Sequence, residues 1–269
     1  PITDMDAYRE KLQSLVYASG SAMKPIFAAA KRGAKKRICF AEGEDERVLR
    51  AAQIVLDEGL AKPILIGRPA IIRERIERFG LRLTEGMHYQ VVNVEDDHRY
   101  RDFWQTYHRL TERKGVTVQL AKIDMRRRLS LIGSMMVHKG EADGMICGTW
   151  STPDAHLHYI DQVIGLRPGV STYACMNALL LPDRQIFLVD THINYDPTAE
   201  QLAEITIMAA DEMTRFGLIP RAALLSHSNF GSSNQPSAVK MRETLALVQQ
   251  QAPWLEIDGE MHGDTALDA

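Results

Sequence analysis

The stretch RICFAEGEDERVLRAAQIVLDEGLAKPILIGRPAIIRERIERFG, residues 37–80, decides the fold class of this chain of 269 residues. Its two short apolar runs, RICFA and PILIG, have the length of buried strands, and each precedes a longer segment with helical spacing. Gly59 and Gly80 stand where helices commonly end, and Pro69 stands where a first helical turn tolerates proline. Short apolar strands alternating with longer helices predict a parallel sheet covered on both faces.

The same alternation continues along the rest of the chain. A polar strand is predicted near residues 91–92, and residues 98–140 are predicted as a long helical tract with a break at Gly115. A second series of strands starts at ADGMICG and continues through STYACMNALLL, QIFLVD, AALLS and LEIDG. The turn sequence LPDRQ makes residues 171–189 a hairpin of adjacent strands.

These patterns divide the chain into three predicted parts. Residues 1–35 form a helical leader of two helices, residues 36–140 a first α/β domain, and residues 141–269 a second one. We place the boundary near Glu141 because the long helix ends there and the second set of strands begins.

Charge and cysteine content exclude several classes of protein. The 32 Lys and Arg residues against 35 Asp and Glu give a net charge of -3, so neither nucleic acid nor an anionic membrane is an expected partner. Cys39, Cys147 and Cys175 lie far apart without CxxC spacing, as in a cytoplasmic protein with reduced, packed thiols. No apolar stretch approaches the roughly 20 residues that span a bilayer. Because the sequence starts on Pro1 and not on Met, we expect a chain that is cut from a longer one or trimmed at its start.

The stretch ICGTWSTPDAH, residues 146–156, is the first candidate site. A strand ends here and a helix opens at Pro153, so hydroxyl groups and backbone donors gather at a helix N-terminus and suit a phosphate or an acyl oxygen. Helix capping alone explains part of the pattern but leaves Trp150 and the surplus hydroxyls unexplained, so both interpretations stay open. The candidate ligand-binding residues are Gly148, Thr149, Ser151 and Thr152.

Two further loops follow apolar strands. In DTHINYDPTAEQLAEI, residues 190–205, a capping box of Thr198 and Gln201 accounts for much of the pattern, and the site candidates are Asp190 and Asn194. The loop SHSNFGSS, residues 226–233, has small residues that allow a phosphate close to the backbone. It matches neither a dinucleotide fingerprint nor a P-loop, and the GxSxG elbow of hydrolases is absent. Its candidates are Ser226, Ser228, Asn229 and Gly231.

Three other patterns have mainly structural interpretations. The acidic residues of FAEGEDERV, residues 40–48, favour a helix start and would repel a phosphate, so we interpret this stretch as a fold element. His156 and His158 do not share a helix face, so we expect surface or interface histidines and no metal site. The run of three arginines at residues 126–128 is typical of a solvated helix face, yet it is also the densest anchor for phosphates.

Several motifs together carry a resemblance to a known family. EGEDERVLRAAQIVLDEGLAKPILIGRP, GEADGMICG, DPTAEQLAEI, HSNFGSS and LEIDGEMHGDTAL resemble the phosphate acetyltransferase (phosphotransacetylase) family. The loop HSNFGSS and the leader DMDAYREKLQ are more similar to the phosphotransacetylase-like C-terminal domain of bacterial NADP-dependent malic enzymes.

The resemblance implies two three-layer α/β domains with mainly parallel sheets and an interdomain cleft that binds coenzyme A. Arg109 and Arg127 correspond approximately to basic positions near the phosphate site of the family. The Ser, Arg and Asp that the family uses in catalysis follow the equivalent of DGEMHGDTAL, so they have no counterpart up to Ala269. Catalytic residues therefore stay unassigned, and the first domain is expected to be incomplete.

The resemblance also implies a function, with alternatives. The leading expectation is an acetyl-CoA-binding domain that regulates a malic enzyme, holds a homo-oligomer together and needs no cofactor of its own. The N-terminal malic domain of the parent would use NADP and a divalent metal, Mg or Mn, to decarboxylate malate to pyruvate in the cytoplasm. The alternatives are an active phosphate acetyltransferase and a structural oligomerisation domain with an empty cleft.

Overall fold

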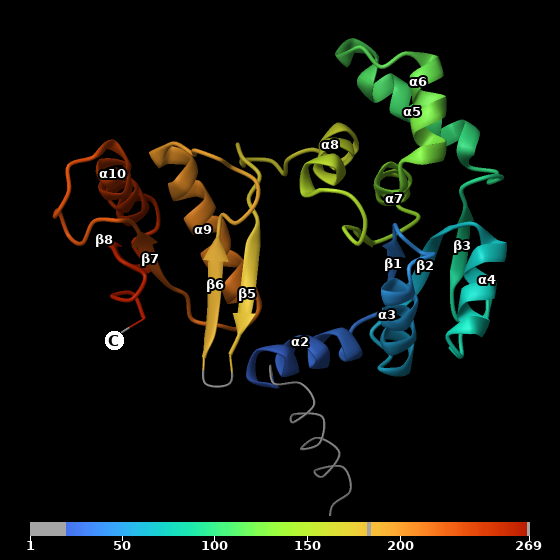
Figure 1. Ribbon diagram of the computed structural model, residues 1–269, viewed down its shortest axis with the longest axis horizontal. Coiled ribbons are helices and arrows are strands. Elements are labelled where there is room, and N and C mark those ends of the chain that lie inside the picture. The colour runs from blue at the N-terminus through green and yellow to red at the C-terminus, as the bar shows by residue number, and fades with distance from the viewer. Residues whose placement is uncertain (1–19, 182–183, 268–269) are drawn as a thin grey trace, which may run out of the picture. The chain divides into compact units, whose positions relative to one another are not determined.

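The computed structural model describes residues 20–181 and 184–267 of the chain, which form two compact units. The first unit spans Phe27–Gly165, and the second consists of the described residues from Leu166 onward together with Gly20–Ile26. Figure 1 labels the elements of each unit. The described part begins with α2 (Gly20–Arg32), so the first helix of the predicted leader lies outside it. Among the described residues, every helix is too short or too polar to cross a bilayer.

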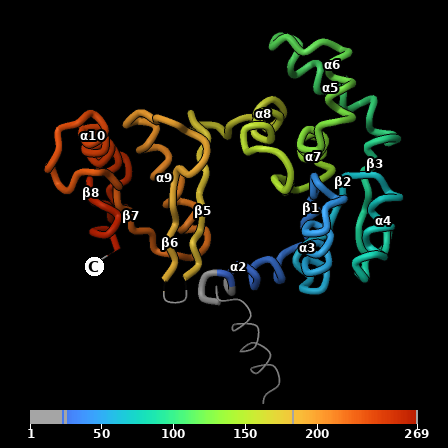
Figure 2. Tube along the Cα trace, viewed as in Figure 1, coloured from blue at the N-terminus to red at the C-terminus, as the bar shows by residue number. Residues whose placement is uncertain are grey.

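A four-stranded parallel sheet organises the first unit. Its strands are β1 (Lys36–Phe40), β2 (Ala61–Gly67), β3 (Gln90–Asn93) and β4 (Gly144–Ile146), and their order across the sheet is β3-β2-β1-β4. The Cα trace in Figure 2 follows the chain from β1 through the next strands. All four strands lie where the apolar runs predict them.

Alternate residues of the strands face two separate cores. Cys39 and Ile64 belong to one buried cluster, whereas their neighbours Phe40 and Leu65 belong to another. Because successive side chains of a strand point to opposite faces, this division means that both faces of the sheet are covered, as predicted. The second cluster packs under α3 (Glu46–Asp57) and α4 (Pro69–Arg78).

The long helical tract contains three helices and a 3-10 turn. These elements are α5 (Tyr100–Thr111), the turn Glu112–Lys114, α6 (Val118–Arg127) and α7 (Leu129–His138). The predicted break at Gly115 is confirmed, with φ 90°. A second break, which no glycine or proline marks in the sequence, falls at Arg128, whose extended backbone joins α6 directly to α7.

The division between the units lies further along the chain than predicted. Strand β4 pairs in parallel with β1, with Ile38 opposite Gly144 and Phe40 opposite Ile146. The helix α8 (Pro153–Val163) packs on α7. The division therefore falls after Gly165, and the predicted boundary at Glu141 is wrong, because the sequence does not show that the strand after the long helix returns to the edge of the first sheet.

The second unit combines an antiparallel hairpin with a parallel pair. The hairpin consists of β5 (Met176–Leu180) and β6 (Gln185–Val189), as predicted, and the pair consists of β7 (Arg221–Leu225) and β8 (Glu256–Met261).

The helices α9 (Ala199–Arg215) and α10 (Pro236–Gln251) pack against these strands. The predicted capping box of Thr198 and Gln201 opens α9, which confirms it.

The strands of the second unit do not join into one sheet over the described residues. The hairpin and the parallel pair are separate, and a groove of about 400 Å³ lies between β6 and β7, lined also by side chains of α9 such as Ile205 and Met213. The α/β class is therefore as predicted, whereas the mainly parallel sheet is found in the first unit.

We predict that Gly43→Ala destabilises the first unit. A Cβ atom at Gly43 would lie 2.7 Å from the carbonyl oxygen and 2.9 Å from the nitrogen of Ile66 in β2. Because the backbone of an interior strand cannot move aside cheaply, the free energy of unfolding should fall by about 1–3 kcal/mol in urea denaturation. In Gly33→Ala the new Cβ would meet only the Ala29 carbonyl, at 3.6 Å, and the change should stay below about 0.5 kcal/mol. Equal urea midpoints for the two variants would contradict the close approach of Gly43 to the backbone of Ile66.

Candidate functional site

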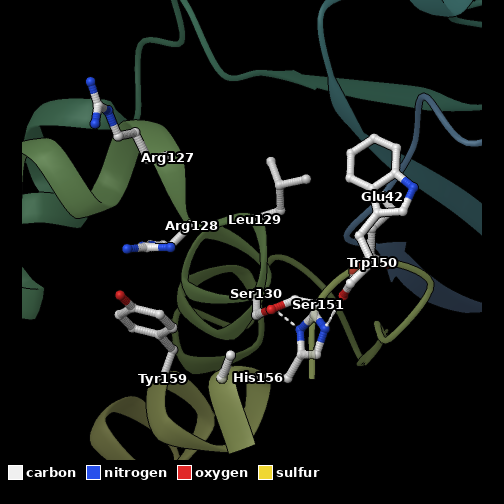
Figure 3. Close-up of a pocket in the computed structure, with 10 residues that line it drawn as sticks. Glu42, Arg127, Arg128, Leu129, Ser130, Trp150, Ser151, His156 and Tyr159 are labelled. Atoms are coloured by element: carbon white, nitrogen blue, oxygen red, sulfur yellow. Dashed lines mark hydrogen bonds and ion pairs between the residues drawn. The ribbon is translucent and has the colours of Figure 1, made fainter. Parts of the chain in front are cut away.

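The first unit carries a pocket of about 140 Å³ where the junction of α6 and α7 lies beside the start of α8. It lies at the carboxyl ends of β1 and β4, the edge of a parallel sheet where ligands usually bind. Figure 3 shows how its side chains lie. The lining residues are Glu42, Arg127, Arg128, Leu129, Ser130, Trp150, Ser151, Ala155, His156 and Tyr159.

Two arginines at the helix junction give one wall of the pocket a positive charge. The exposed Arg127 ends α6, and within the described part of the chain no hydrogen bond or ion pair engages its guanidinium. The Arg128 guanidinium lies 3.7 Å from the Asp124 carboxylate and 5.9 Å from the centre of the Tyr159 ring. Burial raises the pKa of Tyr159 and Asp124 adds to the rise, so the phenol stays protonated near neutral pH.

A histidine at the base of the pocket bonds to groups on both sides of its ring. The His156 Nδ1 lies 2.5 Å from the Ser130 hydroxyl, and its Nε2 lies 2.5 Å from the Trp150 carbonyl oxygen, as the dashed lines in Figure 3 show. The His156 side chain is only 12% exposed. The expectation of a surface or interface histidine is therefore wrong for His156, because the loop before α8 folds back over the ring.

A buried carboxylate lies behind this histidine. Glu42 is 2% exposed, and its Oε1 accepts the Gly148 N–H at 3.2 Å and lies 3.9 Å from the His156 Nε2. The interpretation of residues 40–48 as a fold element only is wrong for Glu42, which reaches the pocket.

The interpretation as a fold element is right for Glu44 and Asp45. Glu44 forms a bidentate pair with Arg68, at 2.9 and 2.7 Å. Asp45 caps α3 and accepts the Trp150 indole N–H at 2.8 Å. The hydrogen bond from the Arg47 guanidinium has the largest effect on the pKa of Asp45 and lowers it. Burial raises the pKa, but the Trp150 hydrogen bond lowers it further, to about 2.

The loop before α8 uses its predicted residues in different ways. Ser151 lines the pocket, with φ 75°, whereas the other three contribute no atom to its lining. The Gly148 N–H bonds to Glu42, the Thr149 carbonyl accepts from Arg47 at 3.3 Å, and Thr152 caps α8 through the Ala155 N–H. Capping and Trp150 placement thus account for most of this pattern.

The two arginines that are predicted near a phosphate, Arg109 and Arg127, lie in different places. Arg127 lines the pocket, but Arg109 lies in α5, outside the pocket, where its Nη2 donates to the Thr106 hydroxyl at 3.1 Å. The structure therefore brings Arg127 together with Arg128, which the sequence analysis treated only as part of a basic run.

In the second unit, Asp190 and Asn194 bind each other. The Asp190 Oδ2 accepts the Asn194 backbone N–H at 2.7 Å and its side-chain amide at 2.5 Å, and its Oδ1 accepts the Cys175 N–H at 2.9 Å. Burial raises the pKa of Asp190, but these donors outweigh it and the pKa is lowered. The pair organises the turn after β6, and its predicted role toward a ligand stays a prediction.

The loop at residues 226–233 is held by a buried carboxylate in β8. Glu260 is fully buried, and its Oε1 accepts from the Ser228 hydroxyl at 2.7 Å, the Gly231 N–H at 2.9 Å and Arg242 at 2.8 Å. Burial raises the Glu260 pKa, but these donors together bring it to about 2. The Ser228 hydroxyl therefore has its partner inside the protein.

The other predicted residues of this loop also bond within the unit. The Ser226 hydroxyl accepts the Ser228 N–H at 3.1 Å, and the Asn229 side-chain oxygen accepts the His262 N–H at 2.7 Å. These bonds tie the loop to β8 and the residues that follow it.

Sequence reasoning missed most of the pocket, because its residues come from three separate segments, around residues 42, 127–130 and 150–159. Ser130 and His156 are 26 residues apart and share no motif spacing. The one available signal was the position of Ser130 two residues after the run of three arginines. In the described residues, no group of three His, Cys, Asp or Glu side chains could hold a metal ion.

Comparisons with known proteins agree with this architecture. The chain matches the family described as Phosphate acetyl/butaryl transferase over residues 21–269. It is 51% identical over 267 residues both to an NAD-dependent malic enzyme of Rhizobium meliloti and to an NADP-dependent malic enzyme of Salmonella typhimurium. Those alignments cover 99% of this chain and 35% of each relative, so the chain spans about a third of their length. A phosphotransacetylase structure from Staphylococcus aureus matches with TM-score 0.78 and 27% identity, over 92% of this chain and 74% of that one.

We predict that Glu260→Gln lowers stability in a pH-dependent way. The native pKa of about 2 lies below the ordinary value of 4.5, so the carboxylate contributes its full stabilisation above about pH 4.5 and loses it as the pH falls toward 2. The variant should unfold at a lower temperature than the parent at pH 7, and the difference should shrink as the pH falls through this window. Glu256→Gln, on the same strand but paired in solvent with Arg221, is the control and should change little. A difference that does not vary with pH would count against the charged network.

Proposed function

The chain belongs to the phosphate acetyl/butaryl transferase family, and on that basis we propose that it is an acetyl-CoA-binding regulatory and oligomerising domain of a malic enzyme. The observation that carries this proposal is the pair of guanidinium groups, Arg127 and Arg128, in the wall of a pocket at the carboxyl edge of the sheet. Arginine suits the phosphate groups of coenzyme A because its planar fork can bond two oxygens at once.

The size of the pocket limits which part of the ligand it can hold. Sites that enclose a whole drug-sized ligand have about 300–1,000 Å³, more than the 140 Å³ of this pocket. The pocket therefore suits a phosphate group or the acyl end of the ligand. The remainder would lie across the surface, where the Trp150 side chain is 40% exposed and offers an apolar face.

The distribution of charge indicates where an anion would bind. Glu42 occupies the side of the pocket near Trp150 and would repel a phosphate, whereas Arg127 and Arg128 lie at the opposite side (Figure 3). The N-terminus of α7 follows Arg128 directly, and its first N–H groups add positive potential at the same place.

Regulation follows if acetyl-CoA binds two states of the parent protein with different affinity, because only differential affinity shifts an equilibrium. The 51% identity to malic enzymes three times longer supports such a parent. We propose that its N-terminal malic domain decarboxylates malate to pyruvate with NADP and Mg or Mn, that the protein is a cytoplasmic homo-oligomer, and that acetyl-CoA inhibits it as a downstream product.

The second candidate function is an active phosphate acetyltransferase, which would convert acetyl-CoA and phosphate to acetyl phosphate and coenzyme A. The match to the Phosphate acetyl/butaryl transferase family over residues 21–269 favours it. Formation of acetyl phosphate by the chain, measured at saturating acetyl-CoA and phosphate, separates this candidate from a purely regulatory domain.

We predict that Arg127→Ala and Arg128→Ala each weaken acetyl-CoA binding about 10- to 100-fold in isothermal titration, because each removes a charge-assisted bond to phosphate worth about 1.5–3 kcal/mol. Arg126→Ala is the matched control. Its guanidinium lies 4.4 Å from the centre of the Tyr100 ring, outside the pocket, so binding should change little.

Equal losses in all three variants would mean that the basic run acts only through its total charge. In the full-length parent protein, malic activity that ignores saturating acetyl-CoA would contradict the regulatory role even if the domain binds the ligand.

A further inference from the structure

We propose that Ser130 and His156 form a nucleophile and base pair, and that the chain takes an acyl group onto Ser130 from an activated acyl donor, a thioester or an acyl phosphate. The proposal rests on the proposed function for the identity of the donor, but the reactivity of Ser130 stands on the geometry of the pair. Neither residue belongs to a known motif in this sequence.

The proton positions follow from the partners of the His156 ring. A backbone carbonyl can only accept a hydrogen bond, so the nitrogen that lies 2.5 Å from the Trp150 oxygen, Nε2, carries the hydrogen. In the neutral imidazole Nδ1 then has a free lone pair, and the Ser130 hydroxyl, 2.5 Å away, donates to it. A serine that donates to a histidine whose other nitrogen is held by an acceptor has the arrangement of an activated nucleophile.

A third group stabilises the charge that proton transfer creates. When Nδ1 takes the serine proton, the ring becomes an imidazolium, and the Glu42 Oε1 lies 3.9 Å from its Nε2. Glu42 is 2% exposed, so little water screens this interaction. The Gly148 N–H, 3.2 Å from the same oxygen, holds the carboxylate in place.

Ser130 lies at the start of α7, where an oxyanion would also be stabilised. It is the second residue of the helix. The first backbone N–H that makes a helical hydrogen bond in α7 is that of Ile132, which donates to the Arg128 carbonyl at 3.1 Å. The N–H groups of residues 129–131 therefore have no helical acceptor and lie at the positive end of the helix dipole. With Arg127 and Arg128, they place positive potential beside the carbon that Ser130 would attack.

The thiol of the neighbouring Cys147 is held in its protonated form. Burial raises the pKa of the Cys147 thiol and Glu42 adds to the rise, while the Ser130 hydroxyl lowers it. The thiol therefore stays protonated near neutral pH, and the thiolate is the reactive form of cysteine.

The reaction balances with water as the only co-reactant. The Ser130 oxygen attacks the acyl carbon and forms an ester, the bond from that carbon to sulfur or to the phosphate oxygen breaks, and the serine proton passes through His156 to the leaving group. Water then attacks the ester, gives one proton to His156, and releases the carboxylic acid. That proton returns to the serine oxygen, which restores the pair.

A serine-directed fluorophosphonate reagent tests the pair without any need for acetyl-CoA. We expect it to form a bond to the Ser130 oxygen with loss of fluoride, and mass spectrometry of peptides to locate the adduct there in the unmodified chain. Hydrolysis of p-nitrophenyl acetate should follow the same residues. His156→Gln should lower both rates at least ~100-fold, as expected for loss of a general base, and Ser130→Ala should abolish both.

His158→Gln is the matched control, because His158 lies on the same helix two residues away and is exposed. It should react at the rate of the parent chain. Absence of an adduct at Ser130 in the parent chain overturns the proposal, and so does labelling that does not depend on His156. The first result requires no variant, so a folding defect in a variant cannot hide it.

Isothermal titration of acetyl-CoA into the same preparation separates this proposal from the proposed function. Acetyl-CoA binding without an adduct overturns the nucleophile and leaves the regulatory role intact. An adduct without acetyl-CoA binding supports the nucleophile and contradicts the regulatory role.

Discussion

The parallel pairing of β4 with β1 is the constraint on which the pocket depends. It brings residues 141–156 beside residues 36–48, although about a hundred positions separate them in the chain. A bidentate ion pair closes the ladder at its start, with Arg37 bonded to the Asp143 carboxylate at 2.9 and 3.2 Å. Both side chains are solvent-accessible, and exposed ion pairs contribute little to the free energy of folding. The main effect of this pair is therefore to fix the register of β4 against β1. At the other end of the ladder, the indole of Trp150 bonds to Asp45 and the loop turns into α8.

The pocket has an acidic side and a basic side, and the two sides come from different segments of the chain. Its acidic side comes from the end of β1, where Glu42 is buried behind His156, and its basic side comes from the short link at Arg128. Because the two sides belong to different segments, a positive wall can face a bound anion while a buried carboxylate supports the histidine. The two roles that we propose for this pocket, anion binding and acyl transfer, depend on this separation of charge.

In the second unit, carboxylates hold the polar loops that are predicted as ligand sites. The small polar residues after β7 have the composition of a phosphate-binding loop, yet the Ser228 hydroxyl and the Gly231 N–H both bond to Glu260. A fully buried carboxylate needs several donors to remain charged, and the nearest loop supplies them. Asp190 and Asn194 satisfy each other after β6 in the same way.

Local sequence by itself determined the strands, the helices and their ends, since apolar period, capping residues such as Thr198 and terminal glycines such as Gly59 act within a few positions. It also marked Ser151 as a candidate, because hydroxyl groups near helix starts are visible in the chain, whereas Arg127 was a candidate through the family resemblance. Only the tertiary structure decided that β4 returns to β1, that Glu42 reaches the pocket, and that Ser130 meets His156. Those contacts join residues far apart in sequence, and no local spacing encodes them, because they depend on which edge of the sheet a returning strand occupies.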